Sequence, residues 1–223
     1  MSGRFRSIVL RRINYGEADR IVDILTPDGQ ISAIAKGARR EKSKLAGGIE
    51  LLAVSDITIH DSKSGLAIIT SARMEQFFSK ILEDYDRLQF AYSAIKLVAK
   101  ASKDIDGPEW FAVLEEVLEG LNKPQVSRLL VETWFFVHYA ELLGDELNTR
   151  SDSAGELLVA SENYLYDDTE KVLRLHAQGT ISGDHIKLLR LIAAKPLAAV
   201  SQVGGIDEVL PECWSLARRQ AAV

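Results

Sequence analysis

The pattern of apolar and polar residues changes its period once along the chain, near residue 74. Before that point the period is two. In DRIVDILT, for example, Val22 and Ile24 share one face of an extended strand. After it, apolar residues recur every three or four positions, as in DRLQFAYSAIKLVAK, which is typical of an amphipathic helix. The pattern predicts an α+β protein, with a strand-rich domain over residues 1–75 and a helical domain over residues 76–223.

Five short strands are expected in the first 75 residues. The sequence TPDG at 26–29 joins two of them, because proline presets the second turn position and glycine accepts a positive φ. The sequence SKSG at 62–65 joins another pair. Five strands fit a small barrel better than a sandwich, which needs about seven. An OB-fold barrel is favoured, and an SH3-like barrel is the alternative on strand count alone.

Helices are expected after Asp84 as an N-cap, from Pro108 and from Pro124, the third ending at Gly144. The third is apolar around its whole circumference, which predicts the central helix of a bundle, with its aromatic residues in the core. Residues 145–180 are predicted to be irregular, with a short hairpin or extended segment within 155–168. A helix that ends before Pro196 and a final helical piece over 205–220 complete the prediction.

Motifs for catalysis are missing from the sequence. It contains no GxxxxGK[ST], GxGxxG, HExxH or GxSxG pattern. Its one cysteine, Cys213, allows neither an intramolecular disulfide nor a cysteine-based zinc site, so a reducing, cytoplasmic compartment fits best. No stretch reaches the length of a membrane span. We therefore expect no catalytic residues, no cofactor, no metal and no enzymatic activity.

Charge is distributed unevenly. The net charge is −5, but residues 1–50 hold ten Lys and Arg against six Asp and Glu. Basic residues cluster in a loop that connects the third and fourth predicted strands, against an acidic background. Such a run is often only a solvated loop, but on an OB-fold it favours binding to nucleic acid phosphates. The candidate contacts are Lys36, Arg39, Arg40, Lys42 and Lys44 in the loop, with Arg11, Arg12 and Arg20 on the strands.

The same region resembles the RecO family of bacterial DNA repair and recombination mediators. The resemblance is specific over about residues 8–75 and general over the rest. It is carried by three groups of residues, namely Tyr15, Gly16, Glu17, Asp19, Arg20 and Ile21; Ala35, Lys36, Gly37, Ala38 and Arg39; and Ser43, Leu45, Gly47 and Gly48.

This resemblance implies an OB-fold followed by a helical domain, and a cytoplasmic, nucleoid-associated protein. It implies binding to single- and double-stranded DNA, annealing of complementary strands, and loading of RecA onto strands coated by single-strand-binding protein. The implied partners are RecR, the C-terminal tail of single-strand-binding protein and, as a further candidate, RecF. Lys187, Arg190 and Lys195 on the late helix are the candidate site for that acidic tail.

Many relatives carry a four-cysteine zinc module after the helix that here ends in ELLG. Residues 145–183 contain no cysteine, so we expect no zinc there. We expect packing around Leu157, Leu158, Tyr164 and Leu165 to replace it. Two other functions stay open, a protein-interaction scaffold and an RNA-binding OB-fold protein.

Overall fold

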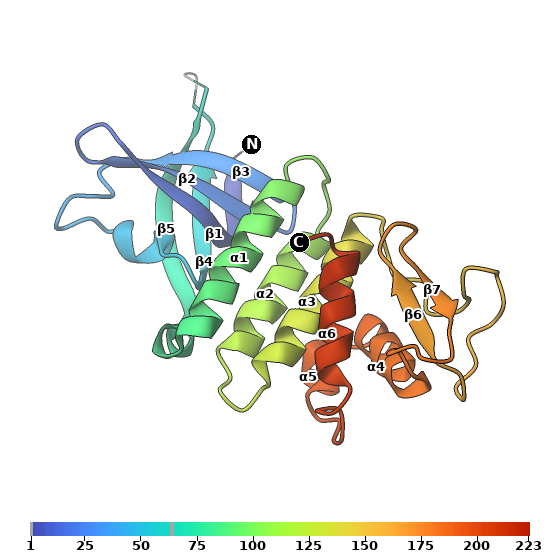
Figure 1. Cartoon of the computed structure of the whole chain (residues 1–223). Helices are drawn as coiled ribbons and strands as arrows, with labels where there is room; N and C mark the ends of the chain where they lie inside the picture. The colour runs from blue at the N-terminus through green and yellow to red at the C-terminus, as the bar shows by residue number, and fades with distance from the viewer. Residues whose placement is uncertain (1, 63–64) are drawn as a thin grey trace. The chain divides into compact units, whose positions relative to one another are not determined.

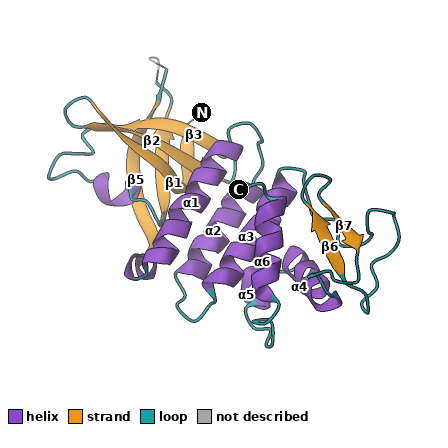
Figure 2. Ribbon diagram, in the orientation of Figure 1, coloured by secondary structure: helices purple, strands orange, loops and turns teal. Residues whose placement is uncertain are grey.

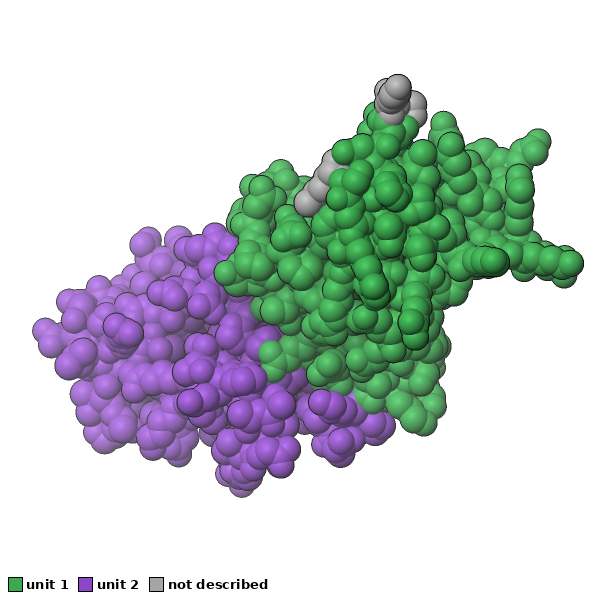
Figure 3. All heavy atoms as spheres, turned by 180° about the vertical axis from the view of Figure 1, so that it is seen from behind, with its two compact units in different colours: residues 1–122 green, residues 123–223 purple. Residues whose placement is uncertain are grey.

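The structure, a computed structural model, describes residues 2–62 and 65–223. The chain divides into two compact units, Met1–Asn122 and Lys123–Val223, which Figure 3 colours separately. The boundary predicted at residue 75 lies close to the end of the last barrel strand. The first compact unit continues past it and also takes in two helices.

Unit 1 begins with a closed barrel of five strands (Figure 1). Their order is β1-β2-β3-β5-β4, β1 also pairs with β4, and the β3–β5 pair is parallel whereas the others are antiparallel. This is the OB-fold, so the predicted fold class is confirmed. The strands are β1 (Gly3–Tyr15), β2 (Asp19–Thr26), β3 (Gly29–Ala35), β4 (Ala53–His60) and β5 (Ala67–Phe77).

The turn between β2 and β3 forms as its sequence predicts. Gly29 has a φ of +116°, a conformation that residues with a Cβ rarely adopt. The hydroxyl of Thr26 donates to the carbonyl of Gly29 and accepts from the amide of Asp28, which fixes the register of the hairpin. The turn predicted at 62–65 includes residues 63–64, which lie outside the described residues.

Alternation along the strands fills the barrel with small and β-branched side chains. Val9, Val22, Ile24, Ala33 and Ile57 belong to this buried core. A bulge at Leu10 shifts the pairing of β1 with β2 by one residue. The alternation of inward-facing and outward-facing side chains along β1 therefore changes at this point. After the bulge Arg11 lies opposite Asp23.

Two helices complete unit 1 (Figure 2). Helix α1 (Tyr85–Ala101) begins after Asp84, whose carboxylate accepts from the amide of Arg87, as the sequence predicts. Helix α2 (Glu109–Leu121) begins one residue after Pro108. The two helices pack on each other, and both contact β1. Short 3-10 helices, η1 (Ala46–Ile49) and η2 (Ser79–Glu83), precede β4 and α1.

Unit 2 is built on helix α3 (Arg128–Leu142), which contacts α4 and α6. As predicted, its aromatic residues Trp134, Phe135, Phe136 and Tyr139 are buried. The expected start at Pro124 is wrong, because residues 123–126 form a turn in which Val126 donates to the carbonyl of Lys123. The other helices are α4 (Gly183–Ala194), α5 (Leu197–Val200) and α6 (Leu210–Gln220). Among the described helices, none combines the length and apolarity that crossing a membrane requires.

The segment after α3 packs differently from the prediction. Its hairpin is β6 (Tyr164–Asp167) with β7 (Val172–Leu175), at the end of the predicted range and beyond it. Tyr164 is buried as expected, but Leu157 is 76% exposed and Leu165 is also exposed. Tyr166, Leu173 and Ile181 form the buried set instead, because the strand alternation turns Leu165 outward between two buried tyrosines.

Candidate nucleic-acid interface

The basic loop, residues 36–45, leaves the end of β3 beside the turn that joins β1 to β2 (Figure 1). Three hydrogen bonds join the two segments. The amide of Gly37 donates to the carboxylate of Asp19 over 2.7 Å. Arg39 donates its amide to the carbonyl of Ala18 over 2.8 Å and its guanidinium to the carbonyl of Gly16 over 3.2 Å. The base of the loop is therefore fixed to the barrel.

Local sequence explains this geometry. Gly37 has a φ of +64°, which a glycine adopts without the strain that a Cβ would bring. Next to it, Ala38 is buried, and Leu45 at the far end of the loop packs against the barrel core. The amide of Ser43 donates to the carbonyl of Arg40, which folds the middle of the loop back on itself. Both ends are thus anchored by apolar residues, and the charged residues lie between them.

The five cations of the loop are exposed, and none forms an ion pair with any described residue. The one acidic residue among them, Glu41, is exposed as well. A cation that already holds a carboxylate must give up that partner to bind a phosphate, whereas these five hold no carboxylate, and the guanidinium of Arg39 holds only the neutral carbonyl of Gly16. The cations in question are Lys36, Arg39, Arg40, Lys42 and Lys44.

The three strand arginines differ from the loop. Arg11 donates to Asp23 over 2.8 Å and Arg12 pairs with Glu50 at 2.7 Å. Arg20 is half-buried, and its Nε is buried without a hydrogen-bond partner among the described residues. The structure therefore brings Arg39 and the β1–β2 turn together. Arg11 and Arg12 already hold carboxylates of unit 1 and are less available to a phosphate.

One exposed aromatic residue beside the loop was not among the candidates from the sequence. Tyr15, the last residue of β1, is 54% exposed and directly precedes Gly16, which accepts from Arg39. Arg11, Ile13 and Tyr15 share the outer face of β1, because alternate residues of a strand point the same way. An exposed aromatic ring beside unpaired cations is a common arrangement for binding single strands. The alternation in LRRINY was the signal that could have found it.

His138 and Cys213 of unit 2 have structural surroundings. His138 contacts Glu141 at 3.1 Å with one ring nitrogen and the carbonyl of Ile192 at 3.2 Å with the other. Burial raises the pKa of Cys213 to about 12, which keeps its thiol protonated. Across residues 2–62 and 65–223, no three His, Cys, Asp or Glu side chains gather as metal ligands.

The acidic residues at 167–170 belong to the turn between β6 and β7. The carboxylate of Asp167 accepts from the amides of Thr169 and Glu170 and from Arg174, which holds its pKa below the usual range. Asp168 binds Arg219 of α6, and its pKa is lowered for that reason. These contacts fasten the hairpin to α6 and engage the carboxylates of Asp167 and Asp168 in structural interactions.

The candidate partner residues on α4 differ in their surroundings. Lys187 pairs with Asp184 at 2.8 Å, and Arg190 donates to the carbonyl of Thr149. Lys195 is the C-cap residue of α4. Only Arg190 of the three is among the residues that line a cavity of about 720 Å³, whose other charged lining residues are Arg150, Glu141 and Glu146. That balance of charge gives an acidic peptide little net attraction there.

Comparison with known proteins agrees with the barrel. The sequence model described as "Recombination protein O N terminal" matches residues 1–78. A DNA repair protein RecO from Rubrobacter xylanophilus is 31% identical over 217 residues, covering 93% of this chain and 87% of the relative. Those from Roseiflexus and from Dehalococcoides mccartyi strain 195 are 30% and 28% identical, covering 87% and 93% of this chain and 71% and 84% of the relatives.

Proposed function

The chain belongs to the RecO family of DNA repair proteins, and from this premise we propose that it is a recombination mediator whose basic loop binds DNA phosphates. In this function it binds single- and double-stranded DNA and anneals complementary strands. It also helps load RecA onto strands coated by single-strand-binding protein. The role in DNA repair and recombination follows from the family, and the proposal adds these activities without any catalytic step.

One observation carries the proposal. The five cations of the basic loop are exposed and unpaired within the described chain, on a loop whose base is hydrogen bonded to the β1–β2 turn. Anchoring lowers the entropy that the loop loses when it binds, and unpaired cations release counterions from DNA without breaking internal ion pairs. Contacts of this kind read no base sequence, which suits a protein that must act on any strand.

The partners proposed are RecR, the acidic C-terminal tail of single-strand-binding protein and RecF, in a cytoplasmic, nucleoid-associated protein. Membership of the family supports DNA and recombination proteins as partners in general, and the proposal adds these three by name. Lys187, Arg190 and Lys195 stay the candidate contacts for the tail, although Lys187 must then exchange Asp184 for the peptide.

The test is the salt dependence of duplex binding. Five phosphate contacts give a log–log slope of about −4.5, and the combined change Arg39→Gln, Arg40→Gln, Lys42→Gln and Lys44→Gln should reduce it by about 3.6. The control removes the same charge from unit 2 through Arg150→Gln, Lys187→Gln, Arg190→Gln and Lys195→Gln, and should keep the slope. An unchanged slope in the loop variant would overturn the assignment.

The two alternatives predict other outcomes of the same assays. A protein-interaction scaffold would keep annealing and partner recruitment in full after deletion of residues 1–75. An RNA-binding protein would prefer RNA to DNA of one sequence, since only RNA offers the 2′-hydroxyl. Strand annealing with and without coated strands, at two salt concentrations, then tests the mediator activity itself.

A further inference from the structure

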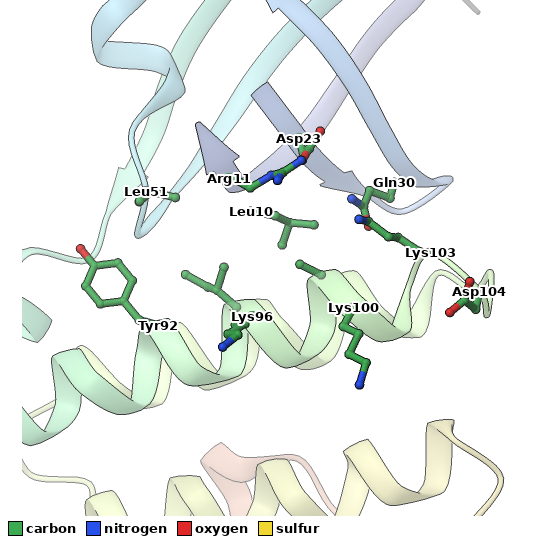
Figure 4. A pocket seen from close by; sticks show the side chains of 12 residues that line it. Leu10, Arg11, Asp23, Gln30, Leu51, Tyr92, Lys96, Lys100, Lys103 and Asp104 are labelled. Carbon is green, nitrogen blue, oxygen red and sulfur yellow. The ribbon is translucent and has the colours of Figure 1, made fainter. Parts of the chain in front are cut away.

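Unit 1 contains a groove between the barrel and α1, away from the loop just described (Figure 4). Its volume is about 370 Å³. Its floor is apolar, with Leu10, Leu51 and Ile95, and its edges carry Arg11, Tyr92, Lys96, Lys100 and Lys103. The groove therefore combines an apolar surface with four cations in a protein whose overall charge is negative.

The helix side of the groove is a row of cations. Tyr92, Lys96 and Lys100 are four residues apart on α1, and Lys103 follows in the turn after the helix ends at Ala101. In Figure 4 the side chain of Lys100 extends away from the barrel. At 1.5 Å per residue the helical part of the row, from Tyr92 to Lys100, is about 12 Å long. The three lysines are exposed, and none forms an ion pair with a described residue, whereas Lys80 holds Glu83 and Lys187 holds Asp184.

The strand side connects the groove to the basic loop. Arg11 lines the groove, and Ile13 and Tyr15 continue along the same outer face of β1 to the turn that holds Arg39. The distance along β1 from Arg11 to Tyr15 is about 13 Å at 3.3 Å per residue. Ile13 is 40% exposed, so this connecting face is open to solvent.

Two carboxylates line the groove, and one of them is already engaged. Asp23 accepts from Arg11 and from the hydroxyl of Ser32, and its side chain is 7% exposed. Figure 4 shows Asp104 at the far end of α1, beyond Lys103, whose side chain points toward Gln30. Most of the row therefore presents uncompensated positive charge.

We propose that this groove is a second contact for nucleic acid. It binds a single strand that runs from the basic loop, past Tyr15 and along the outer face of β1, to the groove. Its backbone phosphates lie along Lys96, Lys100 and Lys103, and its bases lie toward Tyr92 and the apolar floor. The inference rests on the proposed DNA binding and adds the path and the length of strand that one molecule covers. The linear row favours a polyanion with evenly spaced charges over an acidic peptide, whose carboxylates are irregularly placed.

The test compares the full chain with the triple variant Lys96→Gln, Lys100→Gln and Lys103→Gln on oligothymidine of about 6 and about 20 nucleotides. The shorter lies within the range of about 4–16 nucleotides for one OB-fold site and the longer lies beyond it. Loss of three single-strand contacts should reduce the salt slope on the long strand by about 2 and weaken binding about tenfold at low salt. The gain in affinity from the short to the long strand should disappear. The matched control, Lys80→Gln with Arg174→Gln and Arg218→Gln, removes three exposed charges to which no binding role is assigned, and should keep both the slope and the gain in affinity with strand length.

Restoring the charge distinguishes a contact from a folding defect. Lys96→Arg, Lys100→Arg and Lys103→Arg together should recover the slope of the unaltered protein. If the glutamine variant keeps its slope while the loop variant loses its own, the groove is not a contact and the loop assignment stands. If the glutamine variant loses binding to an acidic peptide while its DNA binding is unchanged, the inference is likewise overturned.

Discussion

The carboxylate of Asp19 accepts a hydrogen bond from the amide of Gly37 over 2.7 Å, and so joins two segments 18 residues apart in the sequence. Both segments contain residues that carry the family resemblance, the first in YGEADRI and the second in AKGAR. The two motifs are therefore one structural feature, a turn that holds the base of the basic loop. Asp19 acts here by positioning the loop, since its carboxylate itself repels phosphate.

Substitution Asp19→Ala should release the start of the loop without removing any cation. A hydrogen bond to a charged group contributes about 1.5–3 kcal/mol, so exchange of the Gly37 amide should become about tenfold faster or more. The salt slope of DNA binding should stay the same, because the five cations remain. Hydrogen exchange of the backbone amides measures the first effect and a salt titration the second.

Asp28→Ala is the control for this change, because Asp28 is an exposed acidic residue at the other end of β2. It should leave the Gly37 amide as protected as before. Equal protection of that amide in Asp19→Ala and Asp28→Ala would contradict the positioning role.

Gly47 and Gly48 offer a second matched pair. A Cβ on Gly48 would lie 2.3 Å from the backbone carbonyl carbon and oxygen of Ala72 on β5, whereas one on Gly47 would meet nothing within 4 Å. Gly48→Ala should therefore lower the free energy of unfolding of unit 1 by about 1–3 kcal/mol or more, as overpacking does. Gly47→Ala should change it little, and thermal unfolding of both variants checks this. Similar melting temperatures for the two would refute the close approach.

This pair also shows where sequence reasoning stops. The two glycines are neighbours in a glycine-bounded loop, and the sequence suggests the same hinge role for both. Only the packing of η1 against β5 distinguishes them, and that contact joins segments whose closeness no local pattern reveals. The strands themselves were predictable, because a two-residue period and the turn at 26–29 are local signals.

The candidate site was likewise predictable only where its signal is local. A run of basic residues between strands is visible in the sequence, so the loop cations were found. The ion pairs of Arg11 with Asp23 and of Arg12 with Glu50 depend on strand register and on the bulge at Leu10. The sequence therefore did not reveal that these two arginines are less available to a phosphate. The lysine row of α1 was hidden by the net negative charge of residues 51–223.

Tyr15 should contribute to single-strand binding through stacking. Tyr15→Ala should weaken binding to oligothymidine by about 1–3 kcal/mol with no change in salt slope, because stacking on an aromatic ring releases no counterions. Tyr15→Phe should retain most of the affinity. Tyr85→Ala is the control, since Tyr85 belongs to the same unit and is 73% exposed. Fluorescence anisotropy measures all three, and equal losses for Tyr15→Ala and Tyr85→Ala would refute a specific role for Tyr15.

His185 should make the stability of unit 2 depend on pH below neutrality. Its Nδ1 lies 3.1 Å from the amide of Ser182, from which it accepts a hydrogen bond at the start of α4. Burial lowers the pKa of His185 below its usual value, and the charges of Glu212 and Asp184 oppose this only in part. The unfolded chain therefore binds a proton from about pH 6.5 downward, where the folded protein still resists it.

The part of the stability of unit 2 that depends on neutral His185 is fully present above about pH 6.5, the pKa of this histidine in the unfolded chain. It is lost as pH falls toward the lower pKa of His185 in the folded protein. The carboxylates of Asp167, Asp168 and Asp184 have lowered pKa values, so their contribution is lost only in more acidic solution, below about pH 4. Melting temperatures between pH 7.5 and 5.5 should therefore fall more steeply for the unaltered protein than for His185→Gln, in which glutamine can still accept from the Ser182 amide. Parallel pH profiles for the two proteins would show that His185 is not the titrating group.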